Sequence, residues 1–491
     1  MNCNILLLGQ TGVGKSALLN YLAGKTLAES GINTTTGGVT KGIKKYKVRI
    51  NGQNCQITDS EGLELGHEKK WRKIVNDELF STKELDAVSS WYHIIIFCIG
   101  ANSRVQDFEL NLIDEILNNK YGVIIALTKA DLATEDELST IREDIEDHFE
   151  DSSLLNIIPV CSVQRRNNRL EGKEEIAEAI IESWEQTLIN RLPEHVFCSV
   201  YDNLQKWFEE TSMWLSNQKI GLFHKSRERV LTEMNTRIQS ILKNTNRIIK
   251  TRQNKAIKEI SEVNAALGHV VDLNSIASPT SSLALKLERL DNSFVFDDKK
   301  GNYIAVAGEI AALSIFLPVI GTIGAVGFAL ASLASLFGTT PQEKLQSALT
   351  YQYKTIFKLY SEREIMYEYV LADSFGYYYG TREVAIGALK GRGIEKSTKL
   401  FSDKIKAVEE IISEYDLEDG RAEYYLAYYY YSSESGNSRK SQEKAKRWLK
   451  LSNSHDYPAA NAVYGFGDVF NRMIEQEEKE YKEYYDYWYG E

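Results

Sequence analysis

A glycine-rich segment near the start of the chain could bind phosphate groups. Its residues, GQTGVGKS, run from Gly9 to Ser16 and lie between an apolar run and the helix-forming stretch SALLNYLAGK. Glycines let backbone N–H groups turn inward around the phosphates of a nucleotide. Lys15 would neutralise the charge of the β- and γ-phosphates, and the Ser16 hydroxyl would bind Mg²⁺. The segment predicts a nucleotide site that includes the following residues: Gly9, Gln10, Thr11, Gly12, Val13, Gly14, Lys15, Ser16 and Ala17.

Two further segments could complete the phosphate and metal part of this site. DSEG begins at Asp59, whose carboxylate would hold Mg²⁺ through water, and ends at Gly62, whose N–H would contact the γ-phosphate. A threonine upstream must supply another ligand, and Thr40 is preferred over Thr36 because it lies just before GIKKYKV, separated from it by Lys41 alone. The predicted catalytic residues are Lys15, Thr40 and Gly62, and the predicted magnesium ligands are Ser16, Thr40 and Asp59.

Selectivity for the base would come from two segments later in the chain. TKAD runs from Thr128 to Asp131, and a carboxylate there accepts two hydrogen bonds from guanine, where adenine presents no such pair of donors. The stem of Lys129 would pack beneath the base. In CSV, the backbone at Ser162 and Val163 would meet guanine O6. Together the segments predict binding of GTP and GDP with Mg²⁺ as cofactor.

The elements that must position these motifs are short apolar runs within residues 1–190. Most of the runs are continuous rather than alternating, as strands buried on both faces must be. Asn51-Gly52 predicts a tight hairpin between the second and third runs. We therefore predict an α/β domain with a mostly parallel six-stranded sheet, followed by a long all-α region. The runs are Cys3–Leu8, Lys45–Ile50, Gln53–Thr58, His93–Ile99, Val123–Leu127 and Ile157–Cys161.

The motifs and their order resemble those of P-loop GTPases of the translation-factor class. GQTGVGKS with the segment TGGVTKG is most similar to the septin, GIMAP and immunity-related branch, and to bacterial dynamin-like and Era-like relatives. The resemblance covers residues 1–190 and implies a Ras-like fold that hydrolyses GTP to GDP and phosphate. Beyond it, only the plan of a GTPase with long helices and an apolar hairpin is dynamin-like.

Two positions depart from the patterns of these relatives. Ras-type enzymes carry a water-orienting glutamine after the glycine of the second motif, where this chain has Leu63. Potassium-activated relatives carry an asparagine in the P-loop, where this chain has Gly12. Because an apolar side chain cannot orient water, we expect slow intrinsic turnover unless another group supplies this function.

The composition favours a well-cored cytoplasmic protein. Hydrophobic residues make up 43% of the 491 residues and charged residues 26%, which excludes a disordered chain. The net charge of −11 argues against nucleic acid as a partner of the whole surface, although a local patch could still bind it. The five cysteines lack metal-type spacing and fit a reducing compartment. The N-terminus is expected to form a strand rather than a signal peptide.

Beyond residue 190 the spacing of apolar residues turns helical. The expected segments are a GTPase domain at 1–190, a basic amphipathic helical region at 191–300, an apolar helical hairpin at 301–340, a helical region at 341–400, tetratricopeptide-like repeats at 401–474 and an acidic, tyrosine-rich tail at 475–491. In the repeats, Ala407 recurs as Ala445 and Ala422 as Ala460, at an offset of 38 residues. This part resembles short Sel-type repeats, which would bind a protein partner.

The segment 310–338 contains no charged residue, and Pro318 and Gly321 interrupt it. The interruption favours two short helices over one spanning helix. These helices could form the core of a helical body or insert into a membrane. The basic stretch 219–258 favours an anionic membrane surface, so peripheral membrane association is expected beside a cytoplasmic location.

Three functions follow from these observations. The first is a dynamin-like GTPase that forms homodimers or larger oligomers at a membrane in response to nucleotide. The second is a GTP-switched scaffold whose repeats bind a protein partner. The third is a ribosome- or RNA-associated GTPase like the Era group, which the acidic total charge disfavours.

Overall fold

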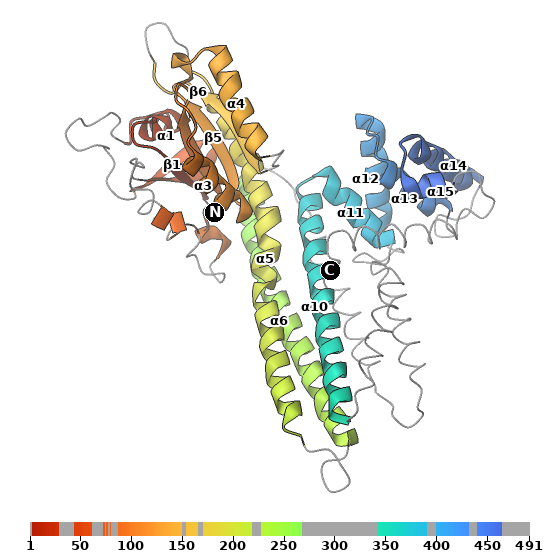
Figure 1. Cartoon of the computed structure of the whole chain (residues 1–491). Coiled ribbons are helices and arrows are strands. Elements are labelled where there is room, and N and C mark those ends of the chain that lie inside the picture. The colour runs from red at the N-terminus through yellow and green to blue at the C-terminus, as the bar shows by residue number, and fades with distance from the viewer. Residues whose placement is uncertain are drawn as a thin grey trace. The chain divides into compact units, whose positions relative to one another are not determined.

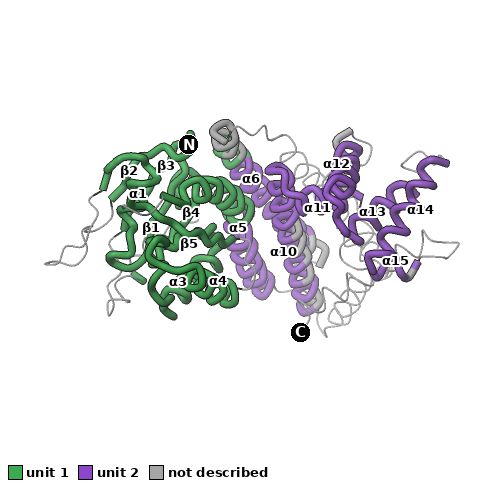
Figure 2. Tube along the Cα trace, turned by 90° about the horizontal axis from the view of Figure 1, so that it is seen from above, with its two compact units in different colours: residues 1–196, 254–271 green, residues 197–253, 272–491 purple. Residues whose placement is uncertain are grey.

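The computed structural model describes residues 2–28, 44–60, 87–149, 154–164, 170–218, 227–267, 341–389, 399–431 and 439–463, with isolated positions between 72 and 79. These residues belong to two compact units, 1–196 with 254–271, and 197–253 with 272–491 (Figures 1 and 2). Several predicted features lie outside the described residues: Thr36, Thr40, Gly62, Leu63, the apolar segment 310–338 and the tail 475–491.

The first unit is built on a six-stranded sheet with the order β2-β3-β1-β4-β5-β6. Its strands are β1 (Cys3–Gly9), β2 (Lys44–Ile50), β3 (Gln53–Asp59), β4 (Ile94–Gly100), β5 (Gly122–Thr128) and β6 (Leu155–Val160). β2 runs antiparallel to β3, and the other neighbours are parallel. Asn51 and Gly52 between β2 and β3 have φ angles of 45° and 87°, as a tight Asn-Gly hairpin requires. The predicted sheet and its hairpin are confirmed.

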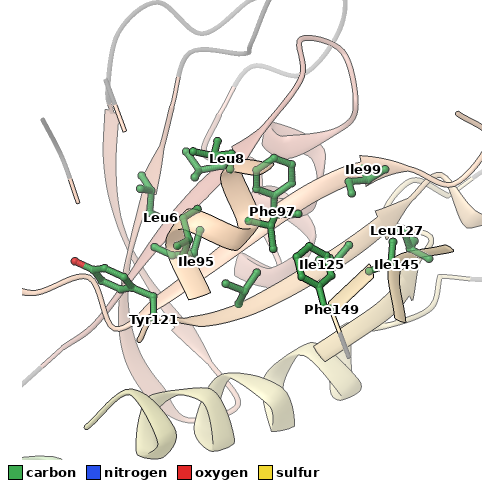
Figure 3. Packing of buried hydrophobic residues seen from close by; sticks show 14 of the residues in the cluster. Leu6, Leu8, Ile95, Phe97, Ile99, Tyr121, Ile125, Leu127, Ile145 and Phe149 are labelled. Carbon is green, nitrogen blue, oxygen red and sulfur yellow. The ribbon is translucent and has the colours of Figure 1, made fainter. Parts of the chain in front are cut away.

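Helices cover both faces of this sheet, and one face carries a continuous apolar core (Figure 3). Leu6, Phe97 and Ile125, from three neighbouring strands, are at most 1% exposed and pack with Ile145 and Phe149 of α4. Such close packing fixes where the strands end, and the predicted motifs follow those ends. The described helices of this unit are α1 (Lys15–Ala23), α3 (Asp107–Asn118), α4 (Glu135–Phe149), the first part of α5 (Lys173–Ser216) and the end of α6 (Arg227–Leu267), with the short turns η2 (Val88–Ser90) and η3 (Ala130–Leu132).

A buried polar network attaches α5 to the amino ends of the strands. The Thr187 hydroxyl donates to the His93 carbonyl at 2.7 Å and accepts from the Gly122 N–H at 2.9 Å. The Asn4 N–H donates to His93 Nδ1, so the proton lies on Nε2, which donates to the Val88 carbonyl. Burial lowers the pKa of His93 to about 4, which keeps the ring neutral. α5 continues without a break past residue 190, where the sequence places the end of the domain.

The second unit is helical. It contains the rest of α5, most of α6 (Arg227–Leu267), α10 (Pro341–Ser374), α11 (Tyr378–Leu389), α12 (Lys399–Tyr415), α13 (Gly420–Tyr431), α14 (Arg439–Ser454) and α15 (Pro458–Val463). Within this unit α5 and α6 are antiparallel, because Arg237 lies over the Trp214 ring while Arg252 contacts Cys198. In the part of the chain that the structure describes, no helix is long and apolar enough to cross a membrane.

A repeated turn divides the second half of this unit into helix pairs. α10, α12 and α14 each end next to a residue with a positive φ angle, and these residues are forty positions apart: Gly376 (87°), Asp416 (49°) and Asp456 (54°). In each copy the next N–H donates to the carbonyl five residues earlier: Tyr377 to Ala372 at 2.9 Å, Leu417 to Ile412 at 3.1 Å, and Tyr457 to Ser452 at 3.2 Å. This is the hydrogen bond that closes a Schellman-type helix end.

The structure also corrects the repeat offset of 38 residues. An offset of 38 aligns the second helix of each pair, α13 with α15, where Ala422 and Ala460 are both buried. It does not align the first helix of each pair, α12 with α14. There the buried residues align at an offset of forty: Ile405 with Ala445, Val408 with Trp448, and Ile412 with Ser452. Between the residue with the positive φ angle and the next helix lie three residues before α13 (417–419) but only one before α15 (457), and these two extra residues account for the difference. The first copy of the repeated turn, at Gly376, was not found by comparing residue types in the sequence.

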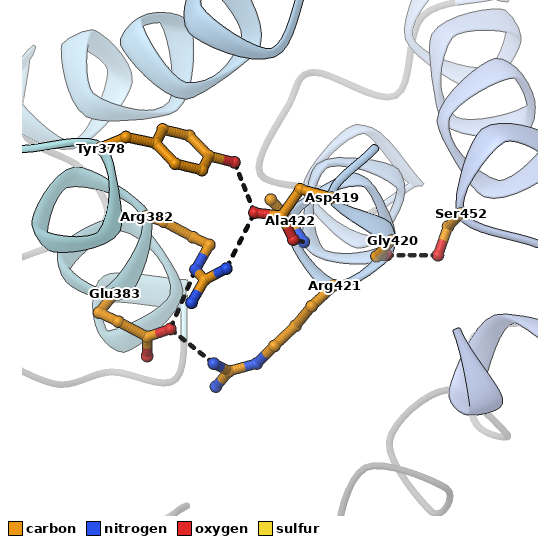
Figure 4. Close-up of polar contacts among 8 residues, drawn as sticks. All are labelled: Tyr378, Arg382, Glu383, Asp419, Gly420, Arg421, Ala422 and Ser452. Atoms are coloured by element: carbon orange, nitrogen blue, oxygen red, sulfur yellow. Dashed lines mark hydrogen bonds and ion pairs between the residues drawn. The ribbon is translucent and has the colours of Figure 1, made fainter. Parts of the chain in front are cut away.

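An ionic network joins neighbouring helix pairs (Figure 4). Asp419 Oδ2 accepts from the Tyr378 hydroxyl at 2.6 Å and from Arg382 at 3.0 Å. Its other oxygen accepts from the Ala422 N–H and thereby caps α13. Glu383 contacts both Arg382 and Arg421. Most of these groups are partly buried, where an unpaired charge would be costly, and each charge in the network has a partner. These contacts hold the turn before α13 in place.

Candidate nucleotide site

The loop after β1 can surround an anion only because glycines occupy three of its positions. Gly9, Gly12 and Gly14 have φ angles of 134°, 79° and 116°, a region that other L residues rarely adopt. Gly9 also lies against β4, where an added Cβ would stand 2.3 Å from the carbonyl oxygen of Cys98. The conformation of this loop therefore depends on these glycines.

Gly9→Ala is expected to lower the free energy of unfolding by about 2–4 kcal/mol, because the new methyl group must displace the backbone of β4. Gly52→Ala is the matched control, since Gly52 has a similarly positive φ of 87° but no atom within 4 Å of the added Cβ. Its cost is expected to be about 1 kcal/mol. Urea denaturation followed by circular dichroism measures both variants, and equal losses would contradict the proposed clash.

The predicted phosphate and metal residues lie together at the end of this loop. Lys15 is buried, and its Nζ donates to the carbonyls of Gly9 and Gln10, each at 2.9 Å. Burial lowers the pKa of its amine, since the charged form is poorly solvated there. Ser16 Oγ donates to Asp59 Oδ2 at 3.1 Å, so two of the three predicted magnesium ligands are in contact. Thr40, the third, lies outside the described residues.

The TKAD segment is tied directly to the same loop. Thr128 Oγ1 donates to the Val13 carbonyl at 2.5 Å, and Lys129 Nζ donates to the Gly12 carbonyl at 2.8 Å. Lys129 has a φ of 56°, an uncommon value for a residue other than glycine. The stem of Lys129 thus spans from the end of β5 to the loop after β1, and the side chain of Asp131 lies beyond it, exposed.

The CSV segment lies next to TKAD because Val160 of β6 pairs with Thr128 of β5. Cys161 forms an isolated bridge to Glu171, with backbone hydrogen bonds of 3.2 and 3.1 Å in the two directions. Ser162 follows as a partly exposed residue, and the side chain of Val163 is 48% exposed. All the predicted binding residues that the structure describes therefore lie at the carboxyl ends of β1, β3, β5 and β6.

Comparisons with known proteins agree with this geometry. Residues 4–129 match the family described as "50S ribosome-binding GTPase". These residues form a P-loop GTPase domain. The chain is 23% identical to GTPase Der of Bradyrhizobium sp. over 210 residues, which are 42% of this chain and 41% of the relative. It is 27% identical to GTPase Era of Ruminiclostridium cellulolyticum over 173 residues, 35% of this chain and 53% of the relative.

The chain thus spans about half or less of these relatives. Among solved structures, translation elongation factor SelB from Methanococcus maripaludis, in complex with the GTP analogue GPPNHP, has a TM-score of 0.26 and 18% identity, covering 38% of this chain and 34% of that one. The predicted GTPase domain is confirmed by the family match, and the named relatives are the GTPases Der and Era.

Two residues that sequence reasoning missed hold the P-loop of this GTPase domain in place. The buried carboxylate of Glu109, on α3, hydrogen-bonds to the side chain of Gln10, and burial raises its pKa. Glu109 also accepts from the Gln106 N–H at 3.1 Å. Cys98 packs against Gly9 from β4. The capping pattern Gln106–Glu109 was readable in the sequence, but nothing in it reveals the contact with Gln10.

The residues of the GTPase domain fit a nucleotide with Mg²⁺. A hydroxyl and a carboxylate in contact, Ser16 and Asp59, are the oxygen donors that Mg²⁺ prefers. Thr11 Oγ1, within the P-loop, is buried and has no hydrogen-bond partner among the described residues. A buried hydroxyl without a partner costs about 1–3 kcal/mol, and a phosphate oxygen would satisfy it.

Proposed function

We propose that the chain binds GTP and hydrolyses it to GDP and phosphate with Mg²⁺. The observation that carries this proposal is the contact of Ser16 with Asp59 on a loop that Thr128 and Lys129 anchor to the base-selecting segment. This arrangement joins a triphosphate and metal site to a guanine site. A Gly-rich turn without a nucleotide would need neither of these contacts.

Each residue has a distinct task in this proposal. Mg²⁺, held by Ser16 directly and by Asp59 through water, would neutralise charge on the β- and γ-phosphates. Lys15 would exchange its two carbonyl partners for phosphate oxygens, which bind an ammonium more strongly. Backbone N–H groups of Gly12 and Gly14 would donate to the phosphates. We expect slow turnover, because Leu63 cannot orient the attacking water.

The test is phosphate release from GTP by the full chain. We expect release to require Mg²⁺, to stop when excess EDTA removes the metal, and to return when Mg²⁺ is restored. Ser16→Ala should lower the rate by about 100-fold or more, since it removes a direct ligand of the metal. Ser139→Ala, on the exposed face of α4, is the matched control and should leave the rate unchanged. Release that continues in EDTA would contradict the proposal.

For the cellular role, we propose a ribosome- or RNA-associated GTPase like Era. The support is that the matching family is described as ribosome-binding and that the named relatives are Der and Era. Dynamin-like self-association at a membrane depends on the segment 310–338 and stays a prediction, as do the septin-like branch and the Sel-type repeats that would bind a protein. Co-sedimentation with ribosomes, lost at high salt, supports the proposed role, whereas pelleting with vesicles alone contradicts it.

A further inference from the structure

Helix α6 carries an unusual excess of positive charge for so acidic a chain. Between Met234 and Gln253 it contains five Lys or Arg residues and no Asp or Glu, while the whole chain has 58 basic and 69 acidic residues. All twenty of these positions belong to the second unit and to one uninterrupted helix. The local charge of this helix is therefore opposite to that of the chain as a whole.

Two of the five cations serve packing within the unit. The guanidinium of Arg237 lies 4.5 Å from the centroid of the Trp214 ring, which stabilises a cation. Arg252 donates to Cys198 Sγ at 3.0 Å. Both side chains are partly buried against α5. These contacts account for Arg237 and Arg252 without any external partner.

The other three cations form an exposed stripe. Lys243, Arg247 and Lys250 follow one another at steps of four and three residues, which places them on one face of the helix. Arg247 donates to Asn244 Oδ1 at 3.1 Å, and none of the three has an ion-pair partner among the described residues. We call these three side chains the α6 stripe. No described residue neutralises its charge.

The α6 stripe stands on a rigid support. The opposite face of the helix is apolar and buried, with Ile238 and Ile249 at most 4% exposed. Thr245 on that face is fully buried and contacts the Tyr360 hydroxyl of α10. Because the helix is held by this packing, the backbone positions of the three cations are fixed before any partner binds. A preformed row of charges loses little conformational entropy on binding.

The neighbours of the α6 stripe indicate which anion it suits. Ser240 and Thr251 are exposed beside it, and Thr236 continues the same face. The Thr251 and Thr236 hydroxyls donate to the carbonyls of Arg247 and Thr232 in the same helix, which leaves their oxygens able to accept from sugar hydroxyls. Hydroxyl side chains next to Lys and Arg are typical of contacts to phosphate and sugar oxygens of nucleic acids. A helix that inserts into a lipid surface needs apolar side chains on its exposed face, and α6 has no exposed large hydrophobic residue among those described.

We propose that the α6 stripe binds the sugar–phosphate backbone of RNA, without reading its sequence. This inference rests on the RNA-associated role above but not on GTP hydrolysis. It assigns the contact to a helix outside the residues that match the GTPase family, 4–129. Three exposed cations without an ion-pair partner in the described part of the chain, together with the adjacent hydroxyls, supply the contact. Its strength falls with salt as counterions compete for the phosphates.

The experiment measures fluorescence anisotropy of a short mixed-sequence RNA duplex with the full chain, at about 50 and 200 mM salt. The triple variant Lys243→Gln, Arg247→Gln, Lys250→Gln is expected to bind about 10-fold or more weakly at the lower salt. The slope of the logarithm of its affinity against the logarithm of the salt concentration should also become shallower, by about one unit per lost phosphate contact. The matched control is Lys446→Gln, Arg447→Gln, Lys450→Gln, on the exposed face of α14, which removes the same charge and the same residue types.

We expect the control to bind RNA within about 2-fold of the unaltered chain, and both variants to keep their GTP affinity and thermal stability. Equal losses in the two variants would mean that only total charge matters and would overturn the α6 assignment. An unaltered chain that binds vesicles containing phosphatidylserine but not RNA would overturn the RNA partner. RNA binding with no GTP hydrolysis would leave the α6 inference intact and contradict the catalytic proposal alone.

Discussion

Asp131→Asn is expected to lower the affinity for GTP by about 1,000-fold. The variant loses one of two acceptor oxygens and turns an amide donor toward the two donors of guanine, which leaves polar groups unpaired in the complex. Xanthosine triphosphate, which has an acceptor oxygen in place of the guanine amine, should bind the variant better than it binds the unaltered chain. Isothermal titration with both nucleotides measures this exchange of preference.

The control for Asp131→Asn is Asp136→Asn, because Asp136 is equally exposed and lies only five residues later, on α4. It should leave the affinity for both nucleotides unchanged. If Asp131→Asn bound GTP as the unaltered chain does, the TKAD segment would not select the base. The arrangement of Thr128 and Lys129 against the P-loop would then serve only to hold β5 in place.

Lys15→Ala is expected to lower the affinity for GTP by about 100-fold and to bring hydrolysis below detection. A charge-assisted contact to phosphate contributes about 1.5–3 kcal/mol, and no other described cation of the P-loop replaces it. The fold should survive, because among the described residues the buried amine hydrogen-bonds to the carbonyls of Gly9 and Gln10, both in the loop itself. Filter binding of labelled GTP and a thermal melt measure the two effects.

The control for Lys15→Ala is Lys25→Ala, an exposed lysine just after α1, which should change neither quantity. A Lys15→Ala protein that melts like the unaltered chain yet keeps full GTPase activity would refute the role assigned to Lys15. A variant that fails to fold would instead show that the carbonyl contacts are structural. The melt therefore decides how the binding result is interpreted.

The sheet, and the gathering of the predicted site residues at its carboxyl edge, were predictable because their signals are local. A strand buried on both faces must be apolar throughout, so β4 and β5 are visible as runs of Ile, Val and Phe. The chemistry of phosphate binding also fixes residue types at fixed spacing, as in Gly9 to Ser16. The contact between Ser16 and Asp59 follows from the parallel pairing of β1 with β3, which those patterns imply.

Features that depend on distant contacts were not predictable in this way. The capping pattern of α3 does not reveal that Glu109 reaches Gln10. α5 is bound to the sheet through Thr187 and His93, which are nearly a hundred positions apart, and nothing in the sequence near either residue reveals this contact. The repeated turn is a property of backbone conformation, and Gly376, Asp416 and Asp456 can all adopt it although their types differ. A comparison of residue types therefore missed the first copy.

Isothermal titration of the full chain with GTP, GDP and ATP in the presence of Mg²⁺ tests the central claim most directly. The account predicts one-to-one binding of GTP and GDP, and no detectable binding of ATP at the same concentrations, because only guanine offers two donors to Asp131. Comparable binding of ATP and GTP would contradict it. So would the absence of any heat on adding GTP to a chain whose thermal melt shows a folded protein.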